Sequence, residues 1–484
     1  MRICFLQDNG INESLALCDL SAYLRALGHD TQLFIEREEP RLLDAVRAYA
    51  PSLILITANI LNSAWTLPMA RRIKQAFPET VLALAGTAAT FLTEDLSRQA
   101  AADVLVLGEA EYPLDAITAD IQEHGRVCVH DNLWVRDGDD WARGRFFNRL
   151  TDLDALPPAH RQLYYKYEFI RRMPAKRFLS GRGCLHQCAY CFNPVLRANS
   201  DTGAGRPFVR MRRPESVLAE IDDVRAQSVL RHVHFSDDLF LAFPEWVARF
   251  TELYRRECRL PFTINSSADL ITDETLDRLA AANCRAVCMG VETGDEQIRT
   301  RLLHKTITDR QLIEAARRIH RHGMKVVTYN MIALPDETPE QALKTAEMNH
   351  RIHADLTHVY FAFPVPKTRM YEDAVRTGHL RADESTLALE KRFVNEPGPA
   401  FASPHNEELL KVYDLFLAVA RFGPARRLAR RLRKRLPAPL RRIIRAWYMI
   451  KAARIFGMPL WSGYLYYRHV GDIGRRTTIY HTLV

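Results

Sequence analysis

The chain has 484 residues, of which 47% are hydrophobic and 26% charged, with a formal net charge of +9 at pH 7. This length predicts two or three domains, and the composition is that of a globular protein. Nine irregularly spaced cysteines argue against a disulfide scaffold. The N-terminus turns polar too early for a secretory signal, and no uncharged apolar run approaches the ~20 residues of a bilayer span. These features predict a cytoplasmic protein that does not span a membrane.

Residues 1–125 alternate short apolar runs with amphipathic stretches. Apolar residues at spacings of three and four, as in Leu15–Leu27, predict helices between the strand-like runs. Alternating strands and helices predict a doubly wound parallel sheet with right-handed crossovers. The predicted strands are Ile3–Leu6, Gln32–Ile35, Leu53–Thr57, Val81–Ala85 and Val104–Leu107.

Small or polar residues follow the strands of this first sheet. Parallel sheets bind ligands beyond the carboxyl ends of their strands. The glycines there could let the backbone approach a ligand or could simply make tight turns, and the polar side chains could bind a ligand or be solvated. The candidate residues are Thr57, Asn59, Gly86, Thr87, Gly108 and Glu109.

Residues 126–175 are predicted to connect two domains. Asn132–Phe147 has the pattern of a β-hairpin that turns at Asp137-Gly138-Asp139. The following Leu156-Pro157-Pro158 cannot continue a helix.

Three cysteines stand close together after an apolar, strand-like segment. Cys184, Cys188 and Cys191 are spaced C-x3-C-x2-C, with no fourth cysteine nearby. Most 4Fe–4S clusters have four cysteine ligands, so three would leave one iron open to bind and activate a small molecule. Structural zinc normally takes four protein ligands, and only His186 is near. The spacing therefore favours a 4Fe–4S cluster over zinc or buried free thiols.

A second series of strands and helices begins at residue 176. Six strand–helix units predict a partial (β/α)6 barrel, and barrel enzymes place their chemistry at the C-terminal ends of the strands. The predicted strands are Arg177–Ser180, His232–Phe235, Phe262–Asn265, Ala286–Gly290, Val326–Asn330 and His358–Phe363. The strand ends carry the cysteine loop, Ser236-Asp237-Asp238, Ser266-Ser267, Glu292-Thr293 and Asn330.

The C-terminal region, 381–484, is predicted to be mainly helical. Its stretch 421–454 holds 13 Lys or Arg and no acid, so the rest of the chain is net acidic and the chain as a whole is not expected to bind nucleic acid. Basic residues beside Trp447–Ile450 and Trp461–Tyr467 could lie on an anionic membrane surface, grip an acidic substrate or RNA, or form a solvated amphipathic cover over the barrel.

The cysteine motif, with Tyr190 before its last cysteine, resembles the signature of radical S-adenosylmethionine (SAM) enzymes, whose partial barrel has six βα units. Three downstream segments resemble one branch of this superfamily: His234–Phe240, Met289–Gly294 and Met331–Thr338. In this superfamily the amino and carboxylate groups of SAM chelate the open iron, and electron transfer splits SAM into methionine and a 5′-deoxyadenosyl radical. The resemblance implies a 4Fe–4S cluster, SAM and an electron donor such as flavodoxin or ferredoxin.

The first domain resembles the cobalamin-binding domain that precedes the barrel in this branch. The resemblance lies in Leu27-Gly28-His29, Ala85–Thr90 and Gly108–Glu111. The usual Gly-Gly-Pro-His-Ala-Thr and Gly-Glu-Gly-Glu motifs are altered at Ala85, Thr87, Ala88 and Ala110. The Asp-x-His-x-x-Gly motif is missing, but members of this branch commonly lack it. The resemblance therefore still implies bound cobalamin, with the six candidates named above as its contacts.

The resemblance also implies that SAM binds at the strand ends of the barrel. Of Asp237 and Asp238, one is expected to hold the SAM ammonium and the other to cap the following helix. Glu292 could hold the ribose hydroxyls or the ammonium, Lys305 could hold the carboxylate or lie on a solvated helix face, and Asn330 could reach the adenine or ribose. Five other residues are expected to lie in loops or pack without binding a ligand: His29, His234, His304, Cys284 and Cys288.

These features predict a cobalamin-dependent radical SAM methyltransferase that methylates an unactivated carbon of a small-molecule or lipid-like substrate. The nearest alternative runs a cyclisation, rearrangement or oxidation with the same cofactors. A tRNA methylthiotransferase is disfavoured because Cys4, Cys18 and Cys128 do not follow successive strand ends, and a nucleic-acid or membrane-surface binding protein is the alternative from another class. The predicted domains are 1–125 (cobalamin-binding), 126–175 (connector), 176–380 (barrel) and 381–484 (helical, basic).

Overall fold

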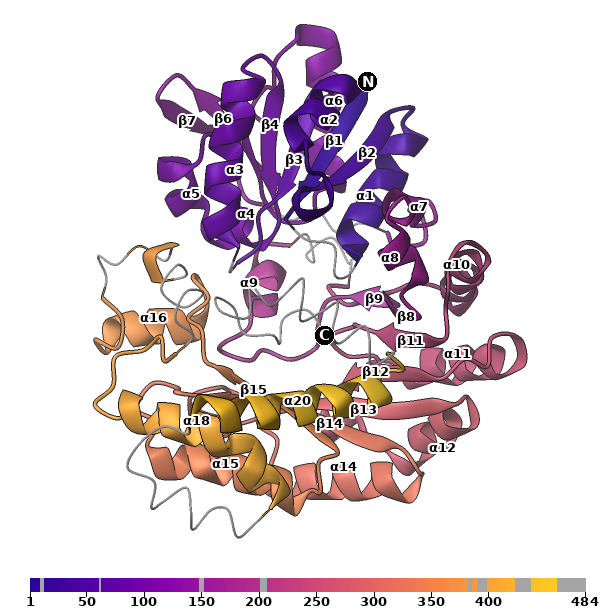
Figure 1. The fold of residues 1–484 in the computed structure, drawn as a ribbon, viewed down its shortest axis with the longest axis vertical. Coiled ribbons are helices and arrows are strands. Elements are labelled where there is room, and N and C mark those ends of the chain that lie inside the picture. The colour runs from indigo at the N-terminus through magenta and orange to yellow at the C-terminus, as the bar shows by residue number, and fades with distance from the viewer. Residues whose placement is uncertain are drawn as a thin grey trace. The chain divides into compact units, whose positions relative to one another are not determined.

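A computed structural model gives the fold, and it describes residues 1–8, 13–60, 62–147, 152–200, 207–381, 385, 387–389, 398–422 and 437–458. The chain divides into two compact units. The first comprises Met1–Arg172, Val195–Arg210 and Asp383–Val394, and the second comprises Met173–Pro194, Met211–Ala382 and Asn395–Val484. Each unit is built on its own sheet (Figure 1).

The first unit contains a seven-stranded sheet of order β2-β1-β3-β4-β5-β6-β7. Its strands are β1 (Arg2–Gln7), β2 (Asp30–Ile35), β3 (Leu53–Thr57), β4 (Val81–Ala85), β5 (Val104–Val106), β6 (Leu133–Asp137) and β7 (Asp140–Arg143). The first five strands are parallel and agree with the predicted ones to within two residues at either end. The doubly wound sheet is therefore confirmed.

The predicted hairpin forms, but it extends the sheet instead of lying in a free connector. Strand β6 pairs antiparallel with β5, with Leu105 opposite Trp134, and β7 pairs with β6. Buried Trp134 and Trp141 pack into the apolar cluster of the sheet. Apolar burial on one face of the hairpin explains why it joins the sheet edge.

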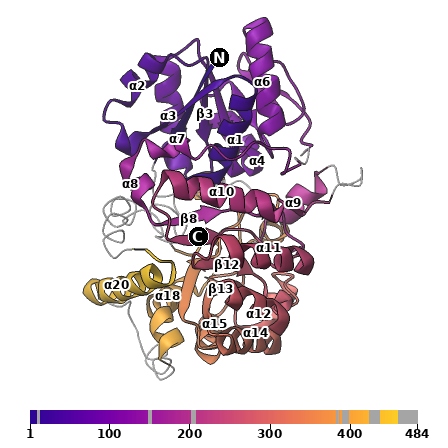
Figure 2. The same cartoon turned by 90° about the vertical axis from the view of Figure 1, so that its right-hand side faces the viewer.

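Helices cover both faces of the first sheet. Helices α2, α3, α4 and α5 pack on one face and α1, α6 and α7 on the other, each over an apolar cluster. Figure 2 shows the same helices from the side. The bounds are α1 (Leu15–Ala26), α2 (Leu42–Tyr49), α3 (Ser63–Ala76), α4 (Thr87–Phe91), α5 (Thr93–Gln99), α6 (Glu111–His124), α7 (Gln162–Tyr165) and α8 (Glu168–Arg172).

The second unit is a partial barrel of six parallel strands in the order β15-β14-β13-β12-β11-β8. The strands are β8 (Ala175–Phe178), β11 (His232–Phe235), β12 (Phe262–Ser266), β13 (Cys284–Glu292), β14 (Lys325–Ile332) and β15 (Leu356–Phe361). Each lies at a predicted strand, so the partial barrel is confirmed. Three shorter elements are β9 (Gly181–Arg182), α9 (Asn193–Ala198) and β10 (Arg210–Met211).

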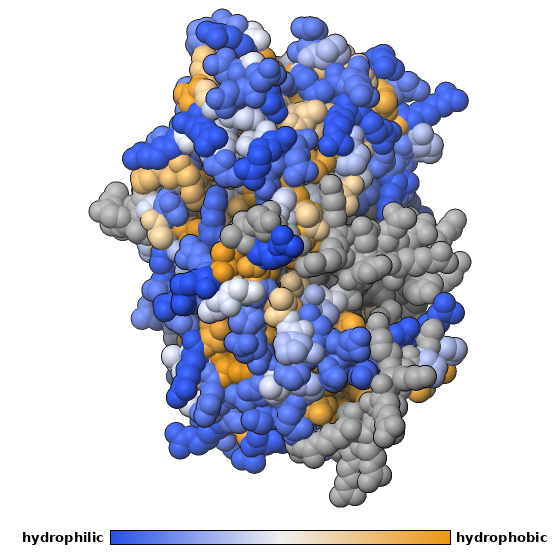
Figure 3. Space-filling model, turned by 90° about the vertical axis from the view of Figure 1, so that its left-hand side faces the viewer, coloured by the Kyte–Doolittle hydropathy of each residue, from blue (hydrophilic) through white to orange (hydrophobic). Residues whose placement is uncertain are grey.

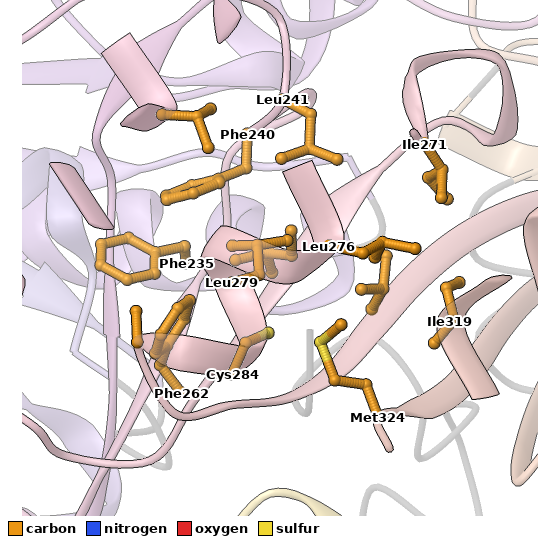
Figure 4. Packing of buried hydrophobic residues seen from close by; sticks show 14 of the residues in the cluster. Phe235, Phe240, Leu241, Phe262, Ile271, Leu276, Leu279, Cys284, Ile319 and Met324 are labelled. Carbon is orange, nitrogen blue, oxygen red and sulfur yellow. The ribbon is translucent and has the colours of Figure 1, made fainter. Parts of the chain in front are cut away.

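Helices surround the outside of the barrel over one large core, part of which Figure 4 shows, with Phe235, Phe262, Leu279 and Met324 among its residues. Several start where the sequence offers a capping box, as Thr338 and Gln341 do for α15. The helices of the second unit are α10 (Pro214–Gln227), α11 (Pro244–Glu257), α12 (Asp273–Ala281), α13 (Glu296–Arg301), α14 (Asp309–Arg321), α15 (Pro339–Arg351), α16 (Arg369–Arg376), α18 (Asn406–Arg421) and, on the inner face, α20 (Ala438–Ile455).

Helix α20 covers the inner face of the barrel. Its Tyr448, Ala452 and the adjoining Phe456 pack on Cys288 of β13 and Leu356 of β15. Figure 1 shows the ribbon of α20 in front of the barrel strands β13 and β14. This agrees with the predicted helical cover. Residues 423–436 of the basic stretch and the aromatic run Trp461–Tyr467 lie outside the described residues.

Candidate active site

The cysteine loop follows β9 and is fixed at several points. The backbone N–H of Ala189 donates to Leu303 O (2.9 Å), and Ala189 O accepts from Met370 N (2.9 Å). Cys191 Sγ accepts from the backbone N (3.4 Å) and the Nδ2 (3.6 Å) of Asn193. These contacts hold the three-cysteine segment between the ends of several barrel strands.

The thiols themselves are suited to bind a cationic cluster. Burial raises the pKa of Cys184 to about 11 and that of Cys191 to about 12, and neighbouring acids and thiols act in the same direction. Free thiols here therefore stay protonated, whereas a metal would supply the positive charge that ionises them. Within the described parts of the chain, no three His, Cys, Asp or Glu side chains are already arranged to hold a metal ion.

Asp237 and Asp238 stand at the end of β11 but neither caps the next helix. Helix α11 starts at Pro244 after Phe243, without a side-chain cap, so the predicted capping role is wrong. Asp237 Oδ1 instead accepts from the backbone N (2.9 Å) and Oγ (2.6 Å) of Ser180, and burial raises the pKa of Asp237 to about 6.

Asp238 faces the cysteine loop. Its Oδ2 accepts from Asn193 Nδ2 (3.1 Å), the same amide that contacts Cys191. Unlike the buried Asp237, Asp238 is an exposed residue. Of the two acids, Asp238 is therefore the one linked directly to the cysteine segment, whereas Asp237 braces the turn after β8.

Glu292 and Lys305 meet in a buried ion pair at the end of β13. Lys305 Nζ lies 3.0 Å from Glu292 Oε1, and both side chains are at most 10% exposed. The expectation of a solvated helix face for Lys305 is thus wrong. Burial raises the pKa of Tyr190, in the cysteine loop, and the nearby Glu292 carboxylate acts in the same direction. The ion pair therefore lies beside the cysteine loop.

The backbone at this strand end is shaped around the ion pair. The register shifts between Gly290 and Glu292, and Glu292 has φ 63°, in the left-handed region that non-glycine residues seldom adopt. A Cβ on Gly290 would lie 2.0 Å from Glu292 Oε1 and 2.6 Å from Lys305 Nζ. Only glycine leaves room for the pair, and strain of this kind is concentrated at functional sites.

Buried oxygens without a hydrogen-bond partner gather at the ends of β11 and β12. Among the described residues, they are Ser236 Oγ, Asp237 Oδ2, Ser266 Oγ and Ser267 Oγ. Buried polar groups are normally paired, so an unpaired group calls for an absent partner. A small polar molecule with several donors, such as SAM, fits this requirement.

Asn330 does not belong to this group. Its Nδ2 donates to Thr328 Oγ1 (3.1 Å) and His358 O (2.8 Å), and its Oδ1 accepts from Asn349 Nδ2 (2.7 Å). The side chain is fully buried and its amide protons are used within the barrel. The predicted contact with SAM is therefore replaced by a structural role, in which Asn330 joins β14, β15 and α15.

In the first unit, the candidate residues tie neighbouring loops together. Thr87 Oγ1 accepts from the backbone N of Ile60 (3.0 Å), and Gly108 N donates to Thr90 Oγ1 (3.0 Å). Glu109 forms an ion pair with Arg210. Each of these side chains has a protein partner, so their contact with cobalamin stays a prediction.

Gly86 brings two of these loops into close contact. It has φ 117°, and a Cβ there would lie 2.9 Å from both Ala58 O and Asn59 Oδ1. Thr57 is half-buried and Asn59 exposed at the end of β3. The strand ends thus present backbone and small side chains, as a large flat cofactor requires.

Two further residues of the barrel rim had no role in the sequence prediction. Glu337, in the loop after β14, is fully buried, and its Oε1 has no hydrogen-bond partner among the described residues. Ser180 supports Asp237 from the neighbouring strand end. Glu337 could have been noticed as an acid within an apolar loop, but the Ser180 contact depends on the fold. His234, Cys284 and Cys288 are buried in the barrel wall, as expected.

Two family models match the chain. Residues 178–348 match the radical SAM superfamily, and residues 3–118 match the B12 binding domain. The barrel with its cysteine loop is thus a radical SAM domain. With the B12 binding domain before it, the chain has the domain order of the cobalamin-dependent radical SAM methyltransferases, and its cofactors are a 4Fe–4S cluster, SAM and cobalamin.

Curated relatives include an uncharacterised methyltransferase of Pyrococcus horikoshii, which is 20% identical over 68% of this chain and 71% of the relative. The hopanoid C-2 methylase of Rhodopseudomonas palustris is 23% identical over 49% of this chain and 46% of its own length.

Among solved structures, the radical SAM methyltransferase TsrM of Kitasatospora setae, with cobalamin and a 4Fe–4S cluster bound, has a TM-score of 0.65 at 16% identity and covers 92% of this chain and 99% of its own. The cobalamin-dependent SAM radical enzyme OxsB, with aqua-cobalamin and SAM bound, has a TM-score of 0.61 at 14% identity and covers 82% of this chain and 55% of its own. At these identities, the likeness shows a shared fold.

Proposed function

We propose that this enzyme methylates an unactivated carbon of a small-molecule or lipid-like substrate. The observation that carries the proposal is the set of buried, unpartnered oxygens beside the cysteine loop, in a chain that also has a B12 binding domain. Relatives named as methylases of a hopanoid and of a cytidylyl-2-hydroxyethylphosphonate support carbon or small-molecule methylation as the reaction class.

When bound, the three cofactors supply reductive cleavage of SAM and transfer of its methyl group. Per turnover, one substrate C–H bond breaks and one C–C bond forms. Two SAM molecules yield one methionine with 5′-deoxyadenosine and one S-adenosylhomocysteine, and two electrons come from a donor of the flavodoxin or ferredoxin class.

The protein side chains would bind and orient these groups. Cys184, Cys188 and Cys191 would hold the cluster. The oxygens of Ser236 and Ser267 and the carboxylate of Asp238 would meet the polar groups of SAM. Charged hydrogen bonds of this kind are stronger in a site from which water is excluded.

The Glu292–Lys305 pair would fix the rim beside the cluster. Because the Glu292 carboxylate lies close enough to Tyr190 to raise the pKa of its phenol, beyond the larger effect of burial, the pair would position the cysteine loop beside β13. In the first unit we propose Thr57, Asn59, Gly86, Thr87, Gly108 and Glu109 as the strand-end residues that border cobalamin. Peripheral contact with a membrane would give the enzyme access to a lipid-like substrate.

The test is an anaerobic assay of the full chain with reconstituted cluster, cobalamin, a reducing donor and SAM labelled in its methyl group. Extracts of small molecules and of lipids from the source cells serve as separate substrate pools. We expect a labelled product, together with 5′-deoxyadenosine and S-adenosylhomocysteine. Deoxyadenosine with an unlabelled, rearranged or oxidised product would instead assign the alternative reaction.

A further inference from the structure

Helix α20 has a second face, which points away from the barrel. Four large apolar side chains on it are exposed: Leu440 (44%), Ile443 (65%), Trp447 (43%) and Ile450 (43%). Their spacings of three, four and three residues place them on one side of the helix. A cluster of exposed large apolar side chains marks a surface that contacts another apolar phase.

The opposite face of α20 is firmly attached to the barrel. Tyr448 OH hydrogen-bonds His358 Nδ1 of β15 (2.5 Å), and Phe456 lies against the rings of His234 and His358. Ala452 is buried in the same cluster. The exposed face is therefore not the result of a loose helix, because its inner side chains fix the rotation of the helix about its axis.

Positive charge surrounds the exposed apolar face. Helix α20 contains no acidic residue, and Arg442 and Arg454 are exposed. Lys451 Nζ lies 5.2 Å from the Trp447 ring centre, and Arg441 pairs with Asp414 (3.4 Å). By sequence alone, residues 421–437 add eight further Lys or Arg and no acid.

We propose that the outer face of α20 docks on an anionic lipid bilayer. The aliphatic side chains would enter the boundary between headgroups and acyl chains, Trp447 would lie at headgroup level, and the flanking cations would meet lipid phosphates. In the described part of the chain, no helix is long and apolar enough to cross a membrane, so α20 would lie in the plane of the surface.

The apolar row decides between lipid and other anionic partners. Nucleic acid would account for the arginines, but it offers no apolar phase to Ile443 or Leu440. An anionic bilayer accounts for both features at once. The purpose of the docking, access to a lipid-phase substrate, rests on the proposed function, but the binding itself does not.

The experiment is sedimentation of the full-length chain with vesicles of pure phosphatidylcholine or of phosphatidylcholine mixed with phosphatidylglycerol. We expect binding to the mixed vesicles that weakens with added salt, and at least ~10-fold weaker binding after Ile443→Asp with Trp447→Asp. The control is Leu27→Asp with Val229→Asp, which places two acids at other exposed apolar positions (43% and 38%). It should bind as the unaltered chain does.

A second readout locates the contact. Brominated lipids should quench the fluorescence of the unaltered chain, and Trp447→Phe should keep binding while losing most of that quenching. Equal binding to neutral and mixed vesicles, no binding, or unchanged binding by the double Asp variant would overturn the proposal. Retention of RNA, or self-association that the double Asp variant abolishes, would assign the face to those partners instead.

The binding assay and the enzyme assay fail independently. If vesicle binding is seen but no methyl transfer occurs with either extract, the proposed function fails and the docking surface stands. If methyl transfer occurs without vesicle binding, the docking surface fails alone.

Discussion

The two sheets of this enzyme differ in how the polar groups at the carboxyl ends of their strands are hydrogen-bonded. At the strand ends of the first unit, loops are joined to one another, as Thr87 is to Ile60 and Thr90 to Gly108. At the strand ends of the barrel, buried oxygens of Ser236, Ser266 and Ser267 have no partner among the described residues. The contacts described at the first surface join its loops to one another, whereas the barrel surface also offers buried oxygens to a polar ligand.

This difference corresponds to two ways of binding a cofactor. A surface of small residues and paired loops can receive a large flat molecule by shape, through backbone approach at Gly86. A surface of unpaired buried oxygens selects a small polar molecule by hydrogen bonding, because leaving such groups unpaired costs about 1–3 kcal/mol each. Substitutions at the two surfaces should therefore have different consequences.

The largest effect is expected at the cysteine loop. Replacing Cys184, Cys188 or Cys191 by Ala should abolish cluster binding and reduce SAM cleavage to background, because a cluster held by two thiols is not retained. Iron content and cluster absorbance measure the first, and deoxyadenosine the second. Cys288→Ala is the control: it is buried in the barrel wall and should lower only stability, by about 1–2 kcal/mol. A loss of iron in that variant would contradict the assignment.

Lys305→Met should have the next largest effect. It leaves the Glu292 carboxylate buried without its cation, which costs about 3–5 kcal/mol. It should also weaken SAM binding, measured by titration, by releasing the rim beside the cysteine loop. Lys344→Met is the matched control, since Lys344 is half exposed in its pair with Asp295 (2.8 Å). Its cost should stay under about 1 kcal/mol; equal costs would refute the special role of the first pair.

The pH dependence of stability should depend partly on Glu337. Burial raises the pKa of its carboxyl to about 8, so the folded chain holds a proton that the unfolded chain has lost. The protonated Glu337 carboxyl contributes fully to the free energy of unfolding below the ordinary pKa of a glutamate, and this contribution is lost as the pH rises to about 8.

Glu337→Gln should remove this dependence. The variant should gain stability relative to the unaltered chain between pH 5 and pH 8, by about 1.4 kcal/mol for each pH unit over which only the unfolded glutamate is ionised. Denaturant unfolding at several pH values measures the gain. A constant difference between the two proteins across that range would show that the carboxyl is ionised in the folded state.

The smallest effect is expected at Gly86. Gly86→Ala adds a Cβ 2.9 Å from Ala58 O at φ 117°, which should cost about 1–3 kcal/mol and lower the affinity for cobalamin. Gly28→Ala has a similar positive φ of 84° but open space around the new Cβ. It should cost about 1 kcal/mol and leave cobalamin binding unchanged, as measured by titration against the absorbance of the cofactor. If both variants bind equally, close packing of the two loops does not shape the site.

Sequence periodicity predicted most of the fold because the strands are short apolar runs between amphipathic helices. His232–Phe235 and Val81–Ala85 agree residue by residue with β11 and β4. The hairpin at Asn132–Phe147 was predicted, but its pairing with β5 was not, because an antiparallel strand at a sheet edge leaves no mark on local sequence. Helix α20 was expected as a cover, and its contact with β15 depends on tertiary structure alone.

The site was predictable where the chemistry is local in sequence. The three cysteines could be identified from their spacing alone. The pairing of Glu292 with Lys305 could not be predicted from the sequence, because it depends on a bulge and on the missing Cβ of Gly290. The prediction that Asn330 contacts SAM failed for a related reason. A polar residue near a strand end can either bind a ligand or join neighbouring strands, and here the Asn330 amide is hydrogen-bonded to Asn349 and His358.

The attachment of α20 to the barrel has a consequence for synthesis of the protein. Tyr448 meets a histidine 90 residues earlier in the chain, so the inner wall is finished only after the ribosome has made nearly the whole polypeptide. Until then, the apolar and aromatic interior of the barrel faces water or a chaperone. The space-filling view in Figure 3 shows one face of the folded molecule, whose described residues are mainly hydrophilic with some apolar patches. Shortened forms that end before residue 437 should therefore aggregate, even though they retain the three cysteines and the rest of the candidate active site.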